Sequence, residues 1–192
     1  KFNKGNPTHI VYKEVRYHHI LENLLIQDND INVIGLIRSP FSVINSWLQA
    51  PKEFKSELGW KVEEEWKKAP SKNLERIEEY NGYEKWKEVT NLFLNLEKKF
   101  PNRFHLVNYS NLVSNKMETL KGIFDFCNLP FSEQTQDFLK KSSRKNNEDA
   151  YAVYKTKNND LSWKKTLPTY IVDSIKSDKE FQELNKIFRW SI

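Results

Sequence analysis

Apolar and polar residues alternate along this chain in stretches that predict strands and helices. "INVIGLI" (31–37) is apolar at nearly every position, which is typical of a strand covered on both faces in a parallel sheet. "THIVYKEV" (8–15) and "RFHLVNYS" (103–110) have the short, β-branched and aromatic pattern of further strands. We therefore expect a parallel sheet whose strand at 31–37 is buried on both sides.

Between these strands, apolar residues recur every three or four positions, which predicts helices. The expected helices cover 16–26, 39–50, 83–101, 115–129, 132–143 and the tail from 167. Ser39 is a plausible N-cap for the second helix, and Pro40 suits its first position. This order predicts a single α/β domain over residues 1–192, a parallel sheet flanked by helices, with a variable, charged insertion at about 50–82.

Composition and charge limit the partners. The single cysteine excludes an intramolecular disulfide and a multi-cysteine metal site, so we expect a cytoplasmic protein without a metal. No apolar run approaches the roughly 18 residues of a membrane span. The net charge of +5 suggests an anionic partner. Its lysines are interspersed with glutamates, however, and no nucleic-acid-binding module is recognisable, so nucleic acid is not the expected partner.

Arg38 lies at the hinge between the strand 31–37 and the following helix. Ligands of open parallel sheets bind beyond the carboxyl ends of the strands, where helix N-termini attract anions. A guanidinium there can grip a phosphate with two hydrogen bonds, and Ser39, Ser42 and Ser46 add hydroxyl groups on one helical face. The pattern leaves open the alternative that Arg38 pairs with a carboxylate of the protein.

The stretch "RSPFSVINSW" resembles the segment with which sulfotransferases that use 3'-phosphoadenosine-5'-phosphosulfate (PAPS) bind the 3'-phosphate of this donor. In that family a buried strand leads to an arginine, and a serine follows eight residues later, as Ser46 follows Arg38. The form with proline and Ser-Trp is similar to bacterial, carbohydrate-acting members. The resemblance implies a P-loop-NTPase-like fold and sulfuryl transfer from PAPS to a hydroxyl acceptor, such as a glycan or another small molecule.

Later segments resemble the same family in the same order. "FHLVNYSNLVSN" is similar to the segment that places a tyrosine, here Tyr109, beside the adenine. The basic loop before "SWKKTLP" resembles the loop that closes over the 3'-phosphate, which implies donor-binding roles for Lys155 and Lys157. Ser143 and Arg144 match the family's nucleotide-binding triplet, although a surface turn fits them equally well.

Two departures from the family pattern concern the reacting sulfonate. The five glycines are scattered, and no glycine-rich phosphate loop is present, so we expect that loop to precede residue 1 and the chain to be N-terminally incomplete. The usual Lys-x-His is replaced by Lys13 and Glu14. These are candidates for the cation and the base of catalysis, or else an exposed pair. A non-catalytic nucleotide-binding module, or a basic nucleic-acid-binding or scaffold protein, is the alternative.

Overall fold

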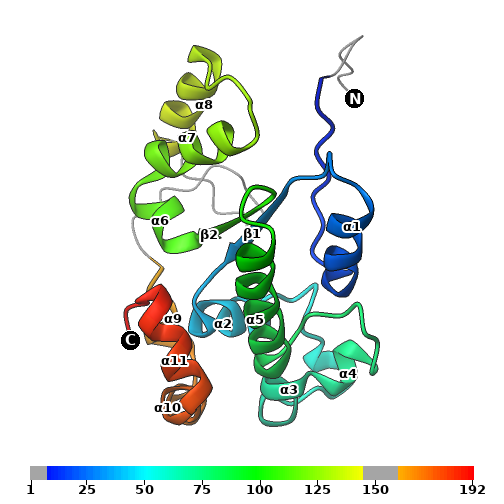
Figure 1. Ribbon diagram of the computed structural model, residues 1–192. Coiled ribbons are helices and arrows are strands. Elements are labelled where there is room, and N and C mark those ends of the chain that lie inside the picture. Colours follow the sequence, from blue (N-terminus) through cyan, green and yellow to red (C-terminus); the bar gives the residue numbers. More distant parts are fainter. Residues whose placement is uncertain (1–7, 145–159) are drawn as a thin grey trace.

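Helices surround a small parallel sheet in the computed structural model, which describes residues 8–144 and 160–192 (Figure 1). The strands are β1 (Val33–Ile37) and β2 (Phe104–Asn108). They pair in parallel, with Val33 opposite Phe104 and Ile37 opposite Asn108. Both strands lie where the sequence predicts them, and their parallel pairing agrees with the predicted α/β class.

The helices follow the predicted order. They are α1 (Leu21–Gln27), α2 (Pro40–Leu48), α3 (Val62–Lys68), α4 (Pro70–Asn73), α5 (Tyr83–Lys99), α6 (Tyr109–Ser114), α7 (Lys116–Phe126), α8 (Glu133–Arg144), α9 (Trp163–Thr166), α10 (Thr169–Ser177) and α11 (Lys179–Phe188). Short 3-10 turns lie at His18–Ile20 and Ser56–Leu58. The charged segment predicted as an insertion contains α3 and α4. No helix of the described residues is long and apolar enough to cross a membrane.

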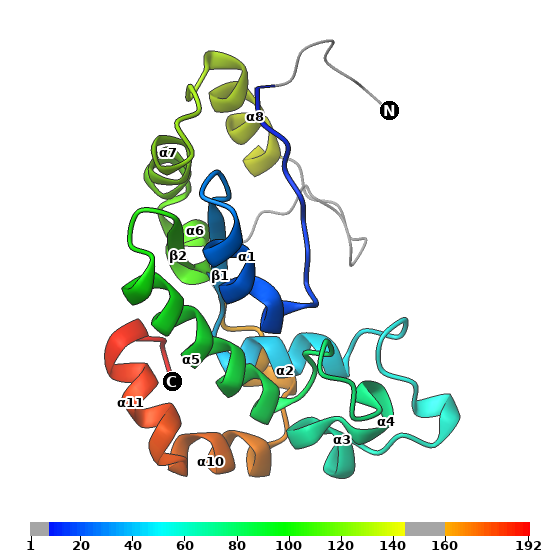
Figure 2. The ribbon, with the colours of Figure 1, turned by 45° about the vertical axis from the view of Figure 1, so that its right-hand side comes forward.

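Helix α5 covers one face of the strand pair and runs between the two ends of the molecule (Figure 2). At one end lie α7 and α8, and at the other lie α10 and α11. Gly35 allows the close approach of α5, because a Cβ atom there would lie 2.7 Å from the ring of Phe104 and 2.9 Å from that of Phe93. On the opposite face, the Phe126 ring of α7 stacks on His105 of β2, with ring centroids 5.1 Å apart.

The main core is aromatic and joins elements that are distant in sequence. Phe41 of α2 stacks on Trp163 of α9 with ring centroids 4.4 Å apart, and it meets Phe181 of α11 edge to face. The remaining buried members of this core are Ile37, Ile44, Trp66, Tyr83, Trp86, Leu167, Ile171, Ile175, Leu184, Phe188 and Trp190. The C-terminal helices are thereby fixed against α2, next to the end of β1.

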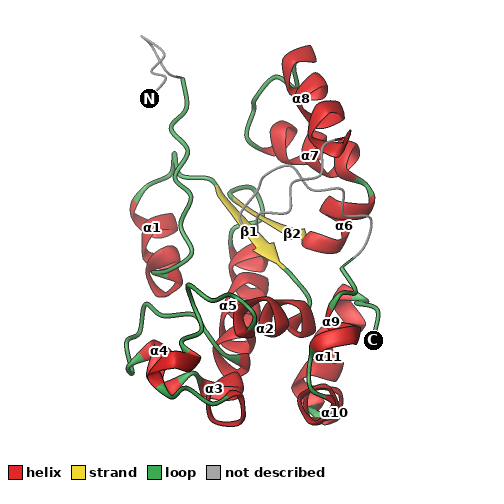
Figure 3. Cartoon of the chain, turned by 180° about the vertical axis from the view of Figure 1, so that it is seen from behind, coloured by secondary structure: helices red, strands yellow, loops and turns green. Residues whose placement is uncertain are grey.

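Two expectations about strands are wrong. Residues 8–15 do not form a strand: the segment runs beside α1 without a strand partner in the described residues, and Val11 is 83% exposed (Figure 3). β-branched residues favour extended backbone, but a strand also needs a neighbour to accept its hydrogen bonds. β1 is not buried on both faces either, since Ile34 and Leu36 are 42% and 50% exposed.

Candidate functional site

The carboxyl ends of β1 and β2 bring two predicted site residues together. Arg38 follows β1, and Tyr109 follows β2 as the first residue of α6. Because the strands are parallel and paired to their last residues, both side chains emerge at the same edge. The guanidinium carbon of Arg38 lies 4.9 Å from the centroid of the Tyr109 ring, within the range of a cation–π contact.

The backbone of Arg38 is held from the α5 side. Trp86, a buried residue of α5, donates a hydrogen bond from its indole Nε1 to the carbonyl oxygen of Arg38 at 3.0 Å. The Arg38 side chain is only 21% exposed. A strand end, an aromatic ring and an indole hydrogen bond therefore fix the position of the cation before any ligand arrives.

The partner of Arg38 in this structure is a carboxylate from far along the chain. Arg38 Nε donates to Asp160 Oδ2 at 2.9 Å, and Nη2 donates to Oδ1 at 2.5 Å. The carboxylate is 7% exposed, and the Ser42 hydroxyl donates to the Asp160 carbonyl oxygen at 2.9 Å. Of the two interpretations that the sequence left open for Arg38, carboxylate pairing is the one that the structure contains.

A cavity of about 240 Å³ adjoins this ion pair. It is bordered by Ser39 from the start of α2, Ser110 from α6, Asp160, and Trp190 near the C-terminus. Within the described part of the chain, Ser39 Oγ and Trp190 Nε1 are buried without a hydrogen-bond partner. Buried donors of this kind are uncommon in folded proteins.

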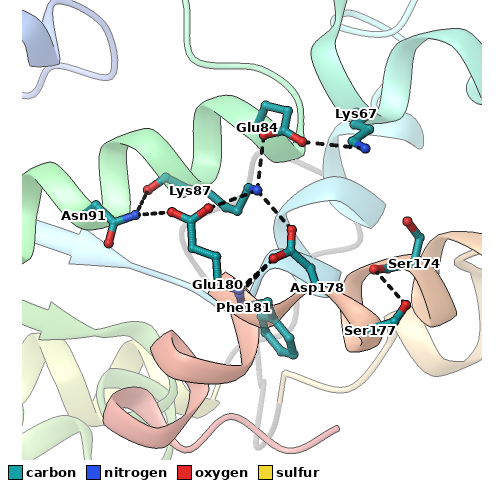
Figure 4. Close-up of polar contacts among 9 residues, drawn as sticks. All are labelled: Lys67, Glu84, Lys87, Asn91, Ser174, Ser177, Asp178, Glu180 and Phe181. Atoms are coloured by element: carbon teal, nitrogen blue, oxygen red, sulfur yellow. Dashed lines mark hydrogen bonds and ion pairs between the residues drawn. The ribbon is translucent and has the colours of Figure 1, made fainter.

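A larger hollow of about 420 Å³ lies elsewhere, between α3, α5 and α11. It is lined by charged side chains, but these neutralise each other: Lys87 contacts Glu84 at 3.2 Å and Glu180 at 3.1 Å (Figure 4). Lys85 pairs with Glu88. We place the candidate site at the strand ends instead, because two of the predicted site residues, Arg38 and Tyr109, meet there.

The sequence is similar to a known protein family. A sequence model described as "Sulfotransferase family" matches residues 29–133, more than half of the 192 residues. The chain belongs to the sulfotransferase family. The matched region contains both strands, Arg38 and Tyr109.

A solved structure supports the fold. The chain is similar to the "Sulfotransferase Domain from the Curacin Biosynthetic Pathway", with a TM-score of 0.50 and 19% sequence identity. The similarity covers 91% of this chain and 59% of that one. It confirms the predicted fold class and shows that the chain spans less than two thirds of the related domain. No curated protein matches the sequence.

The other donor-binding residues predicted from the family motif are placed as follows. Ser46 is exposed on α2, whereas Ser42, one turn earlier, reaches Asp160. Ser143 and Arg144 belong to the last turn of α8, and their side chains lie outside the described residues. Lys155 and Lys157 also lie outside the described residues.

Lys13 and Glu14 are exposed on the segment beside α1, which lies on the opposite side of the strands from α9 (Figures 1 and 3). Glu14 Oε1 accepts hydrogen bonds from the backbone N–H groups of Val15 and Arg16, at 2.8 and 3.0 Å. These bonds lower the pKa of Glu14. The lowered pKa makes Glu14 a weaker base than an ordinary glutamate. An efficient general base has a pKa near the working pH, so this change makes Glu14 less suited to that role.

Sequence reasoning missed Asp160 altogether. A carboxylate at the end of a basic, polar stretch has no periodicity or motif that connects it to an arginine 122 residues away. The available signal was chemical: an arginine at the end of a buried strand requires an anionic partner. Asp160 is a carboxylate in the segment before Trp163, which the family resemblance already brought near Arg38.

Proposed function

We propose that this member of the sulfotransferase family transfers a sulfuryl group from PAPS to a hydroxyl acceptor. The observation that carries the proposal is the position of Arg38, fixed at the carboxyl end of β1 over the Tyr109 ring, within a sequence that matches the family. Sulfuryl transfer resembles phosphoryl transfer in having a loose, in-line transition state. The protein then contributes mainly by positioning the donor and by stabilising charge.

In this proposal each residue of the strand ends has one task. The planar guanidinium of Arg38 binds the 3'-phosphate of the donor through two parallel hydrogen bonds, and Ser46 adds a hydroxyl donor from α2. The Tyr109 ring packs against the adenine. The proposal names the acceptor only as a hydroxyl group.

Calorimetric titration of 3',5'-ADP, the desulfated donor, tests the assignment of Arg38. Arg38→Ala should weaken binding by about 1.5–3 kcal/mol, or one to two decades in dissociation constant, since a charge-assisted contact is lost. Arg38→Lys retains the charge but loses the planar pair of N–H donors, so its affinity for 3',5'-ADP should lie between those of wild type and Arg38→Ala. Ser46→Ala removes one neutral donor and should cost about 0.5–1.5 kcal/mol.

Two comparisons make the titration specific. Arg76 is an exposed arginine, so Arg76→Ala is the matched control and should bind 3',5'-ADP as the wild type does. 5'-AMP lacks the 3'-phosphate and should bind wild type and Arg38→Ala alike. A folded Arg38→Ala protein with unchanged affinity for 3',5'-ADP would refute the proposed donor site.

A nucleotide-binding protein without transfer activity is the second candidate. The observation that favours it is the scatter of the five glycines, none of which forms a phosphate-binding turn between a strand and a helix in the described residues. Transfer of radiolabelled sulfate from PAPS to a panel of hydroxyl acceptors separates the candidates. Turnover on any acceptor supports the enzyme and contradicts the second candidate.

A further inference from the structure

Asp160 uses the same face of Arg38 that a phosphate would need. Guanidinium groups bind carboxylates and phosphates alike through two parallel N–H donors. Here Nε and Nη2 both point at the Asp160 carboxylate, at 2.9 Å to Oδ2 and 2.5 Å to Oδ1. The carboxylate also cancels the single positive charge of Arg38. A phosphate arriving at this site therefore meets an occupied and neutralised cation.

We infer that the Asp160 carboxylate is a built-in competitor that sets the affinity of the anion site, and that it leaves Arg38 when the 3'-phosphate binds. The inference rests on the proposed function and goes beyond it, because it assigns a regulatory role to a protein carboxylate. A phosphate monoester carries more negative charge than a carboxylate, so it displaces Asp160 where a singly charged anion competes poorly.

The carbonyl group of Asp160 and the residues that follow it are held by contacts to α2, so the exchange needs only a rotation of the Asp160 side chain. Ser42 Oγ donates to the carbonyl oxygen of Asp160, and Trp163, three residues later, is stacked on Phe41 in the core. Main-chain displacement at Asp160 would disturb these contacts. Rotation about the side-chain bonds of an aspartate leaves them intact.

The adjoining cavity gives the displaced carboxylate a place. Asp160 lines this cavity, and so do Ser39 and Trp190, whose Oγ and Nε1 are buried without partners in the described residues. Both atoms are hydrogen-bond donors and a carboxylate is an acceptor. Asp160 thus has two alternative environments, its present contact with Arg38 and the adjoining cavity, as a two-state element requires.

Titration of 3',5'-ADP into Asp160→Asn and Asp160→Ala tests the inference. Both variants should bind 3',5'-ADP about tenfold more tightly than wild type, since no charged competitor has to leave. Their affinity for 5'-AMP should be unchanged. Asp137→Asn, which removes an exposed carboxylate from α8, is the control for net charge and should match the wild type. Unchanged or weaker binding of 3',5'-ADP by the Asp160 variants overturns the inference.

The result is distinguishable from failure of the proposed function. If Arg38→Ala weakens 3',5'-ADP binding and Asp160→Asn does not tighten it, the donor site stands and Asp160 merely orients Arg38. If Arg38→Ala has no effect, the donor site itself is wrong. Should the Asp160 variants not fold, the carboxyl ¹³C resonance of Asp160 in wild-type protein gives the answer: it should move on saturation with 3',5'-ADP, and an unmoved resonance overturns the inference.

Discussion

Lys87 joins α5 to the C-terminal helices, and its removal should destabilise the protein measurably. Its Nζ atom contacts Asp178 at 2.9 Å, Glu180 at 3.1 Å and Glu84 at 3.2 Å (Figure 4). The lysine side chain is 12% exposed, and its Nζ atom lies 5.1 Å from the centroid of the Tyr83 ring. Burial alone would lower the pKa of Lys87, but the hydrogen bonds to the three carboxylates raise it above its ordinary value.

The expected magnitude follows from how well each carboxylate is shielded from water. Asp178 is 21% exposed, so its charge-assisted hydrogen bond with Lys87 should be worth about 1.5–3 kcal/mol. Glu84 and Glu180 are 38% and 46% exposed, and each should add no more than about 0.2–1 kcal/mol. Lys87→Met retains the apolar stem, which offsets part of the loss. We expect a net destabilisation of about 2 kcal/mol, or a melting temperature lower by roughly 4–8 °C.

Thermal and urea denaturation of Lys87→Met measure this change directly. Lys186→Met is the matched control, because Lys186 pairs with Glu183 on the surface and both side chains are about 70% exposed. It should change the unfolding free energy by less than about 0.5 kcal/mol. A double-mutant cycle with Asp178→Asn isolates the pairwise energy. A Lys87→Met protein that melts within about 1 °C of wild type would contradict the reasoning.

Two further predictions concern backbone strain and pH. Gly82→Ala should destabilise the protein by about 1–3 kcal/mol, because the φ angle of Gly82 is +90° and the new Cβ would lie 2.8 Å from the Lys67 carbonyl oxygen. Gly122→Ala in α7 should instead stabilise the protein by about 0.5–1 kcal/mol, because its Cβ would meet no atom within 4 Å. Urea unfolding that ranks the two variants the other way would contradict this prediction. Burial and, to a lesser extent, the nearby Lys85 charge lower the pKa of His18 in the folded protein. The unfolded chain therefore binds the proton more tightly, and the unfolding free energy should fall as the pH drops below about 6.5. Urea unfolding at about pH 7.5 and 5.5 should show a smaller loss of unfolding free energy in His18→Gln than in wild type, and an equal loss would refute the prediction.

The sequence was sufficient for features that depend on local periodicity. An apolar run followed by Arg-Ser-Pro placed β1 and the start of α2 correctly, because Pro40 fits the first helical position. The segment 8–15 shows the limit of such patterns. Its residues favour extended backbone, but whether they form a strand depends on a neighbouring strand, and local sequence does not supply that information.

The candidate site shows the same limit at the level of single contacts. Arg38 was predicted because it follows a strand, and Tyr109 because its segment resembles that of the family; parallel pairing brings the two strand ends together. The Arg38–Asp160 pair joins residues 122 positions apart and depends on how α9 packs against α2. Periodicity also could not show that the Ser42 hydroxyl would reach the Asp160 carbonyl oxygen, a contact between residues 118 positions apart.

The central claim is that Arg38 binds the 3'-phosphate of the donor nucleotide, and ³¹P NMR of 3',5'-ADP tests it most directly. The two phosphates of this nucleotide give separate resonances, so one spectrum shows which of them meets the protein. We predict that wild-type protein shifts and broadens the 3'-phosphate resonance more than the 5' resonance, and that Arg38→Ala abolishes this difference. Equal perturbation of both resonances by the wild type, or the same selective shift with Arg38→Ala, would contradict the account.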